Sequence, residues 1–141
     1  MGKKRIIKKQ GSEASASTAL QRVPKKKVAT GTLNILATFN NTLLTLCDSK
    51  GNALIAASSG AIGFKGSRKS TPFAAAKVGE TLALKAQNIG LKEIAVVVKG
   101  VGSGRESAIR GFISKGVIIT SIKDETPIPF NGPQPKKPRR V

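Results

Sequence analysis

The chain has 141 residues with 25 Lys and Arg against 7 Asp and Glu, and its formal net charge of +18 predicts a polyanionic partner. One cysteine and no histidine exclude a conventional zinc site. No segment approaches the roughly 20 apolar residues that a transmembrane helix needs.

The two ends of the chain carry two thirds of the excess charge. Residues 1–27 have a net charge of +8 and residues 127–141 of +4, against +6 for residues 28–126. The first segment is poor in large apolar residues, so we interpret it as an arm that becomes ordered on its partner. It lacks the apolar run of a secretory signal, whereas an organellar targeting peptide stays an alternative. The cations expected to contact the partner here are Lys3, Lys4, Arg5, Lys8, Lys9, Lys25, Lys26 and Lys27.

Three strands with short turns begin the central segment. Residues 31–39 alternate apolar and polar side chains, residues 43–47 follow a turn at Asn40-Asn41, and residues 53–57 follow a second turn. We expect an antiparallel meander, with Phe39 in the hydrophobic core and Cys47 as a small buried side chain.

Residues 60–77 combine glycines with cations and lead into a helix. The cations are Lys65, Arg68, Lys69 and Lys77. Thr71 suits the N-cap of the helix and Pro72 its first position. Glycines allow backbone amides to approach a ligand, and a helix start presents N–H groups without partners. The combination predicts a phosphate-binding surface, and a solvated loop is the alternative.

The helix is expected to run to about Asn88 and to end at Gly90, with an apolar strand following at 94–98. The apolar residues of this helix share one face, which we expect to be buried, and Lys85 lies on the opposite, polar face. Leu84 also falls on that outer face, where it marks either a protein contact or a single exposed leucine.

A glycine-rich loop, a second helix and a last strand complete the central segment. The helix is expected to end near Lys115, with Ile113 facing inward and with Ser103 and Glu106 at the spacing of a capping box. The strand is expected at 117–122. This order of elements predicts an α/β sandwich with a mixed five-stranded sheet over residues 28–126. Five prolines in residues 127–141 then favour an extended tail.

Two segments match nucleotide-binding motifs incompletely. Residues 63–70 have the outline of a P-loop with Arg68 at its second glycine, and residues 100–104 resemble a dinucleotide loop with Arg105 at its third glycine. Phosphates of a polynucleotide explain both segments more simply. Without histidine, a general base would need a strongly shifted carboxylate or lysine. We therefore expect no enzyme, no cofactor and no small-molecule substrate.

The aromatic residues bear on the mode of binding. The chain has no Trp or Tyr, and Phe39 and Phe112 are expected in the core, so stacking on splayed bases is not expected. Charge, backbone amides, hydroxyl groups and long arms suit the shape and backbone of folded RNA. A chromatin-type DNA-binding protein stays the alternative.

Several longer motifs carry a resemblance to a known family. They are ATFNNT (37–42), DSKGNAL (48–54), GFKGSRKSTPFAA (63–75), KGVGSGRESAIR (99–110), ITSIKDETPIPFNG (119–132) and the closing KKPRRV. From about Val28 to its end, the chain resembles the universal small-subunit ribosomal protein eleven family in its bacterial form. The resemblance implies a three-layer α/β sandwich of ribonuclease-H-like topology, without catalytic carboxylates.

The resemblance also implies a structural role in the small ribosomal subunit, in the cytoplasm or in an organelle. Family members bind 16S-type ribosomal RNA (rRNA) on the platform, bridge rRNA helices and help to form the cleft where messenger RNA pairs through its Shine-Dalgarno sequence. The implied neighbours are small-subunit proteins seven, eighteen and twenty-one, with initiation factor three nearby and no membrane.

Matching positions imply a set of RNA-facing residues. They are Asn40, Asn41, Lys65, Gly66, Ser67, Arg68, Lys69, Ser70, Gly102, Gly104, Arg105, Asn131, Lys136, Lys137, Arg139 and Arg140. Two departures concern this set. Val101 and Ser103 replace the prolines of the family's G-P-G-P-G loop, and Phe130 stands where the family commonly carries histidine.

Overall fold

The computed structural model describes residues 24–140. Its elements, in chain order, are β1 (Thr30–Ala37), β2 (Thr42–Asp48), β3 (Ala53–Ser58), α2 (Ser59–Ile62), the 3-10 helix η1 (Gly66–Ser70), α3 (Pro72–Ile89), β4 (Glu93–Lys99), α4 (Gly104–Ile113) and β5 (Ile118–Asp124). All the predicted strands and both predicted helices are present. The short helices α2 and η1 are additional, and they occupy the segment that was expected to be a loop.

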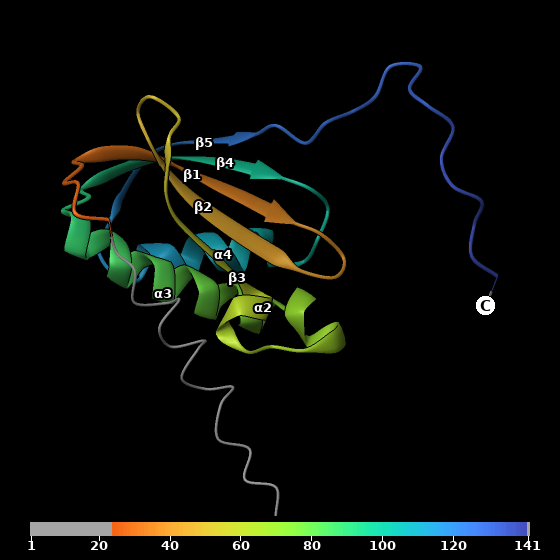
Figure 1. Ribbon diagram of the computed structural model, residues 1–141, viewed down its shortest axis with the longest axis horizontal. Coiled ribbons are helices and arrows are strands. Elements are labelled where there is room, and N and C mark those ends of the chain that lie inside the picture. Colours follow the sequence, from red (N-terminus) through yellow and green to blue (C-terminus); the bar gives the residue numbers. More distant parts are fainter. Residues whose placement is uncertain (1–23, 141) are drawn as a thin grey trace, which may run out of the picture.

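The five strands form one mixed sheet in the order β3-β2-β1-β4-β5. The pairs β1–β2 and β2–β3 are antiparallel, whereas β1–β4 and β4–β5 are parallel. This confirms the predicted α/β class. The helices α3 and α4 lie beneath one face of the sheet (Figure 1). Of the three layers expected, the described residues therefore show two, a sheet and one layer of helices.

The core lies between the sheet and these helices, with Phe112, Leu33 and Leu82 completely buried. The backbones of α3 and α4 come into direct contact. A Cβ atom added at Gly79 would lie 2.5 Å from the Ala108 carbonyl oxygen, and one added at Gly111 would lie 2.4 Å from the Ala76 carbonyl oxygen. The two glycines therefore set the position of α4, and with it the position of the loop that precedes α4.

The predicted ends of α3 are confirmed. The Thr71 side-chain oxygen accepts a hydrogen bond from the Ala74 amide at 3.3 Å, and Pro72 is the first helical residue. Gly90 ends the helix in the left-handed conformation, with φ of 84°. Burial of Cys47 and Phe112 is also confirmed.

Three predictions of side-chain burial are wrong. Phe39 is 76% exposed, because β1 ends at Ala37 and the ring belongs to the following turn. Ile113 is 43% exposed because it is the last residue of α4. Lys85 is buried, since α3 packs against both the sheet and α4 and so buries a wider arc than a single apolar stripe. Desolvation lowers the pKa of the Lys85 ammonium.

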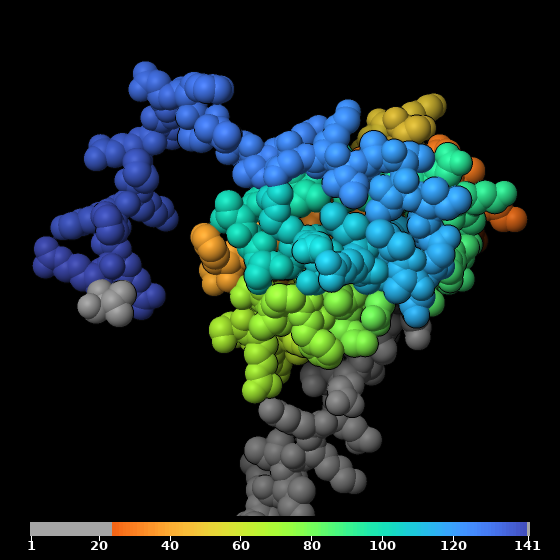
Figure 2. All heavy atoms as spheres, turned by 180° about the vertical axis from the view of Figure 1, so that it is seen from behind, coloured from red at the N-terminus to blue at the C-terminus, as the bar shows by residue number. Residues whose placement is uncertain are grey.

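The C-terminal tail, of which residues 127–140 are described, follows β5 and runs away from the domain (Figures 1 and 2). From Pro127 onward all its described residues are exposed. No helix among residues 24–140 is both long and apolar enough to span a membrane.

Candidate nucleic-acid interface

The predicted loops meet at one end of the sheet. Strands β1, β3, β4 and β5 run in the same direction, so the segments that follow them emerge at a common edge. We call this edge the loop end, and it comprises residues 38–41, 63–71, 100–105 and 124–126. Helices α3 and α4 both begin there. The Ser103 hydroxyl joins two of its parts by donating to the Ser70 carbonyl oxygen (2.8 Å), and the Gly102 amide donates to the carbonyl oxygen of Ala37 at the end of β1 (2.9 Å).

Helix η1 presents the basic part of the loop end. Gly66 starts the helix with φ of 61°, a left-handed conformation that glycine adopts without strain. The hydroxyl of Ser70 donates to the Ser67 carbonyl oxygen at 3.1 Å, and that of Thr71 donates to the Arg68 carbonyl oxygen at 2.8 Å. These bonds fix the backbone that carries Arg68 and Lys69.

The cations of this segment have no acidic partner. The sequence contains no Asp or Glu between Asp48 and Glu80. Among residues 24–140, no carboxylate lies within ion-pair distance of Lys65, Arg68 or Lys69. The structure thus brings together the predicted Lys65, Gly66, Ser67, Arg68, Lys69 and Ser70 in one basic cluster beside two helix starts. Helix dipoles and unpaired cations both favour a bound anion there.

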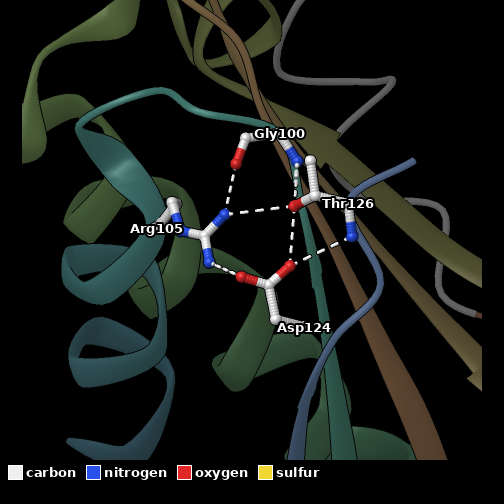
Figure 3. A network of polar contacts seen from close by, with 4 residues as sticks. All are labelled: Gly100, Arg105, Asp124 and Thr126. Atoms are coloured by element: carbon white, nitrogen blue, oxygen red, sulfur yellow. Dashed lines mark hydrogen bonds and ion pairs between the residues drawn. The ribbon is translucent and has the colours of Figure 1, made fainter. Parts of the chain in front are cut away.

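Arg105 lies in an internal network rather than pointing away from the domain (Figure 3). Its guanidinium donates to the Gly100 carbonyl oxygen and the Asp124 carboxylate, and it lies 3.4 Å from the Thr126 hydroxyl oxygen. That hydroxyl donates to Asp124 at 2.6 Å and accepts from the Gly100 amide at 3.2 Å. The network joins the glycine loop, α4, the end of β5 and the base of the tail.

The charge of Asp124 is stabilised within this network. Hydrogen bonds from Thr126 and from Arg105 lower the pKa of its carboxyl to about 2. Sequence reasoning did not connect Asp124 or Thr126 with Arg105. The sequence carries no signal for that connection, because it joins positions 19 and 21 residues apart. Contact of Arg105 with RNA stays a prediction.

The glycine loop packs against the end of β1. A Cβ atom at Gly102 would lie 2.4 Å from the Thr38 carbonyl oxygen, and one at Gly104 would lie 2.5 Å from the Thr42 hydroxyl oxygen. Both positions are buried and leave no room for a side chain, so close packing explains why glycine occurs there. Their contact with RNA stays a prediction. The capping box is wrong, since the Ser103 hydroxyl bonds to η1 instead of capping α4.

The turn between β1 and β2 lies at the same edge. The Thr38 hydroxyl accepts a hydrogen bond from the Asn41 amide at 3.0 Å, and the Asn41 side-chain oxygen accepts one from the Thr42 amide at 2.9 Å. Asn41 is therefore partly used in shaping the turn. Asn40 and Phe39 are exposed beside it.

The N-terminal cations that the structure describes lie at the opposite end of the sheet. The Lys26 ammonium is 2.9 Å from the carboxylate of Asp48, the last residue of β2. The hydrogen bonds from Lys26, Asn52 and Lys50 hold the pKa of Asp48 well below its usual range. Lys25 and Lys27 are exposed at this end. The predicted contacts Lys3, Lys4, Arg5, Lys8 and Lys9 lie outside the described residues.

The remaining predicted contacts lie in the tail. Asn131 adopts a left-handed conformation with φ of 53°, and Lys136, Lys137, Arg139 and Arg140 are all exposed. The tail departs from the loop end, but its cations stand away from the domain (Figure 2). No group of three or more potential metal-ligating residues occurs among the residues that the structure describes.

A family comparison agrees with this geometry. The sequence model of the family Ribosomal protein S11 matches residues 31–140, well over half of the chain. The chain belongs to this family. It is therefore a structural, rRNA-binding constituent of the small ribosomal subunit and not an enzyme. The match covers the sheet, both long helices, the loop end and the tail cations.

Proposed function

We propose that the loop end docks this protein on the platform of the small ribosomal subunit, with η1 as the principal phosphate contact. The observation that carries the proposal is the basic cluster of Lys65, Arg68 and Lys69, which no carboxylate of the described residues neutralises. The starts of α3 and α4 add the positive ends of two helix dipoles to the same site. Phosphate oxygens are the groups that such a surface binds best.

The tail and the N-terminal segment extend this docking into a bridge between rRNA helices. Exposed cations lie at both ends of the sheet, Lys25 and Lys27 at one end and Lys65 and Arg68 at the other. The tail adds four more cations beyond the loop end. Neutralising phosphates on two helices lowers the repulsion that separates them. In this account, Lys3, Lys4, Arg5, Lys8 and Lys9 contribute in the same way.

The family resemblance supports a more specific placement. On this basis the protein helps to form the messenger RNA cleft, with small-subunit proteins seven, eighteen and twenty-one as neighbours and initiation factor three nearby. The ribosome that contains this protein is proposed to be cytoplasmic, with an organellar ribosome as the alternative. Chemical cross-linking of purified small subunits, followed by peptide identification, tests these neighbours. Cross-links to a different set of subunit proteins would overturn this placement.

Salt-dependent binding tests the docking surface. If six to ten phosphates are contacted, the affinity for a small-subunit rRNA transcript should fall with salt at a log–log slope of about −5 to −8. The double variant Arg68→Ala, Lys69→Ala should bind more weakly, with a slope shallower by about 2. The control double variant Lys50→Ala, Lys92→Ala removes the same charge from exposed sites at the opposite end and should lose less affinity.

Three results would contradict the proposal. A wild-type slope near −1 would mean that few phosphates are contacted. Wild-type binding by the Arg68 and Lys69 double variant would remove η1 from the interface. Equal affinity for random duplex DNA would mean that the loop end does not recognise folded rRNA.

A further inference from the structure

An aromatic depression adjoins the basic cluster. It is lined by Ile62, Gly63, Phe64, Phe73, Lys77 and Thr81 and has a volume of about 420 Å³. We call it the Phe73 pocket. Its size falls within the range of roughly 300–1,000 Å³ that is typical of small-ligand sites, so it admits a single planar ring system. It lies between α2, the following loop and the first turns of α3.

The aromatic rings of this pocket are held in a fixed arrangement. Phe73 and Phe64 pack edge to face, with centroids 6.1 Å apart and ring planes at 80°. The Lys77 ammonium lies 5.7 Å from the centroid of Phe73, and Glu80 holds it there through an ion pair of 3.1 Å. Phe73 is nevertheless 64% exposed, although it lies in the first turn of a long helix. A large ring fixed in this way and left in water is suited to contact an external group.

The charged residues around the pocket favour an occupant that carries negative charge. Phe64 directly precedes Lys65, and Phe73 follows η1 with Arg68 and Lys69. None of the residues that line the pocket is acidic, and the carboxylate of Glu80 is already paired with Lys77. A group with a flat apolar face and an attached negative charge matches this surface. An acidic apolar peptide matches the pocket less well, because the cations that would bind its carboxylates belong to the proposed docking surface for RNA.

We propose that the Phe73 pocket takes an unpaired base of rRNA, which stacks on the phenyl ring while its phosphate contacts Lys65 and η1. Every base has a π-face, so stacking of this kind needs no particular sequence. The sequence predicts no base stacking because, with Phe39 expected in the core, few phenylalanines are left for contact with bases. Phe73 and Phe39 are 64% and 76% exposed, so both rings are available for stacking. The inference rests on the proposed docking of the loop end on rRNA.

Conservative variants of Phe73 test the stacking. Phe73→Leu keeps an apolar side chain without a π-face, and Phe73→Tyr keeps the ring. We expect Phe73→Leu to bind a small-subunit rRNA transcript between about 5-fold and about 100-fold more weakly, and Phe73→Tyr to bind as the wild type does. Leu84→Ala is the matched control, because Leu84 is exposed on the same helix about three turns away. Thermal unfolding of each variant checks that the fold is kept.

A spectroscopic readout reports stacking directly. The chain has no tryptophan or tyrosine, so Phe73→Trp introduces a single fluorophore at the pocket. Stacking of a base on the indole should quench its emission when the rRNA transcript is added at low salt. The same titration with Leu84→Trp should change the emission little.

The outcomes separate this inference from the function on which it rests. One outcome is that the wild type binds RNA with a steep salt dependence while Phe73→Leu binds equally well and the emission of Phe73→Trp is not quenched. In that case the stacking inference is wrong and the proposed function stands. If the emission of Phe73→Trp responds to a neighbouring ribosomal protein and not to RNA, the pocket is a protein-docking site and the inference is wrong. If the wild type itself does not bind the transcript, both are wrong.

Discussion

At the scale of single residues, Arg105 fixes the place where the tail leaves the domain. Its planar guanidinium reaches the Gly100 carbonyl oxygen, the Asp124 carboxylate and the Thr126 hydroxyl together. Lysine carries the same charge, but it has no rigid fork with which to hold several acceptors at once. We therefore expect Arg105 to act on RNA binding largely by positioning the tail.

Arg105→Lys should loosen the base of the tail. The amides of Gly100 and Thr126, both hydrogen-bonded within the network, should exchange hydrogen at least about tenfold faster, while amides in β2 keep their protection. Hydrogen exchange followed by mass spectrometry measures this. Unchanged exchange combined with weaker RNA binding would contradict the positioning role and would favour direct contact between Arg105 and RNA.

Asp48 should make folding stability depend on acid pH. Its carboxyl has a pKa held below the ordinary 3.8, so the charged form contributes stability that is complete above about pH 4 and is lost as the pH falls. Asp48→Asn should lower the Tm at neutral pH, and the difference from wild type should shrink at about pH 3. Thermal unfolding monitored by circular dichroism at both values measures the change. A difference that stays constant with pH would contradict this role.

At the scale of elements, the contact between α3 and α4 determines how the loop end is assembled. Gly79→Ala and Gly111→Ala should each destabilise the domain by about 1–3 kcal/mol, since a Cβ atom would meet backbone of the facing helix at 2.5 Å or less. Helix propensity alone predicts the opposite sign, a gain of about 1 kcal/mol. Urea unfolding decides between the two effects. Gly60→Ala is the control, because its Cβ would approach only the Lys69 side chain, at 3.5 Å.

The sequence predicts elements whose causes are local. Alternation identifies β1, and Thr71-Pro72 and Gly90 identify the ends of α3, because each signal lies within a few residues of its effect. Features with distant causes are not predicted. The bond between Ser103 and Ser70 joins residues 33 positions apart, and Lys85 is buried because α3 packs against both the sheet and α4. The cation cluster could be predicted because its residues are neighbours in the sequence. The Arg105 network could not, because only the fold brings its residues together.

At the scale of the whole molecule, the distribution of charge matches a protein that holds separate RNA segments together. Two thirds of the net charge lies in residues 1–27 and 127–141. The tail leaves from the loop end, and the described part of the N-terminal segment lies at the other end (Figure 1), where Lys26 pairs with Asp48. Docking and bridging can therefore be separated by mutation.

Neutralising the tail should weaken RNA binding without affecting the fold. Replacing Lys136, Lys137, Arg139 and Arg140 by Gln removes four charges from exposed residues and keeps the length of the tail. The Tm should stay unchanged, while the salt dependence of rRNA binding becomes shallower by up to about 4 in log–log slope. An unchanged slope would mean that the tail cations do not contact phosphates. A large fall in the Tm would mean that the tail packs on the domain.

The most direct test of the account is ultraviolet cross-linking in cells, with sequencing of the attached RNA and identification of the cross-linked peptides. The account predicts discrete cross-links to the platform region of small-subunit rRNA through peptides that contain η1 and the glycine loop, Gly66–Ser70 and residues 100–105. Scattered cross-links to many RNAs, formed mainly through the tail and the N-terminal segment, would contradict it. In that case the loop end of the domain would not be the docking surface.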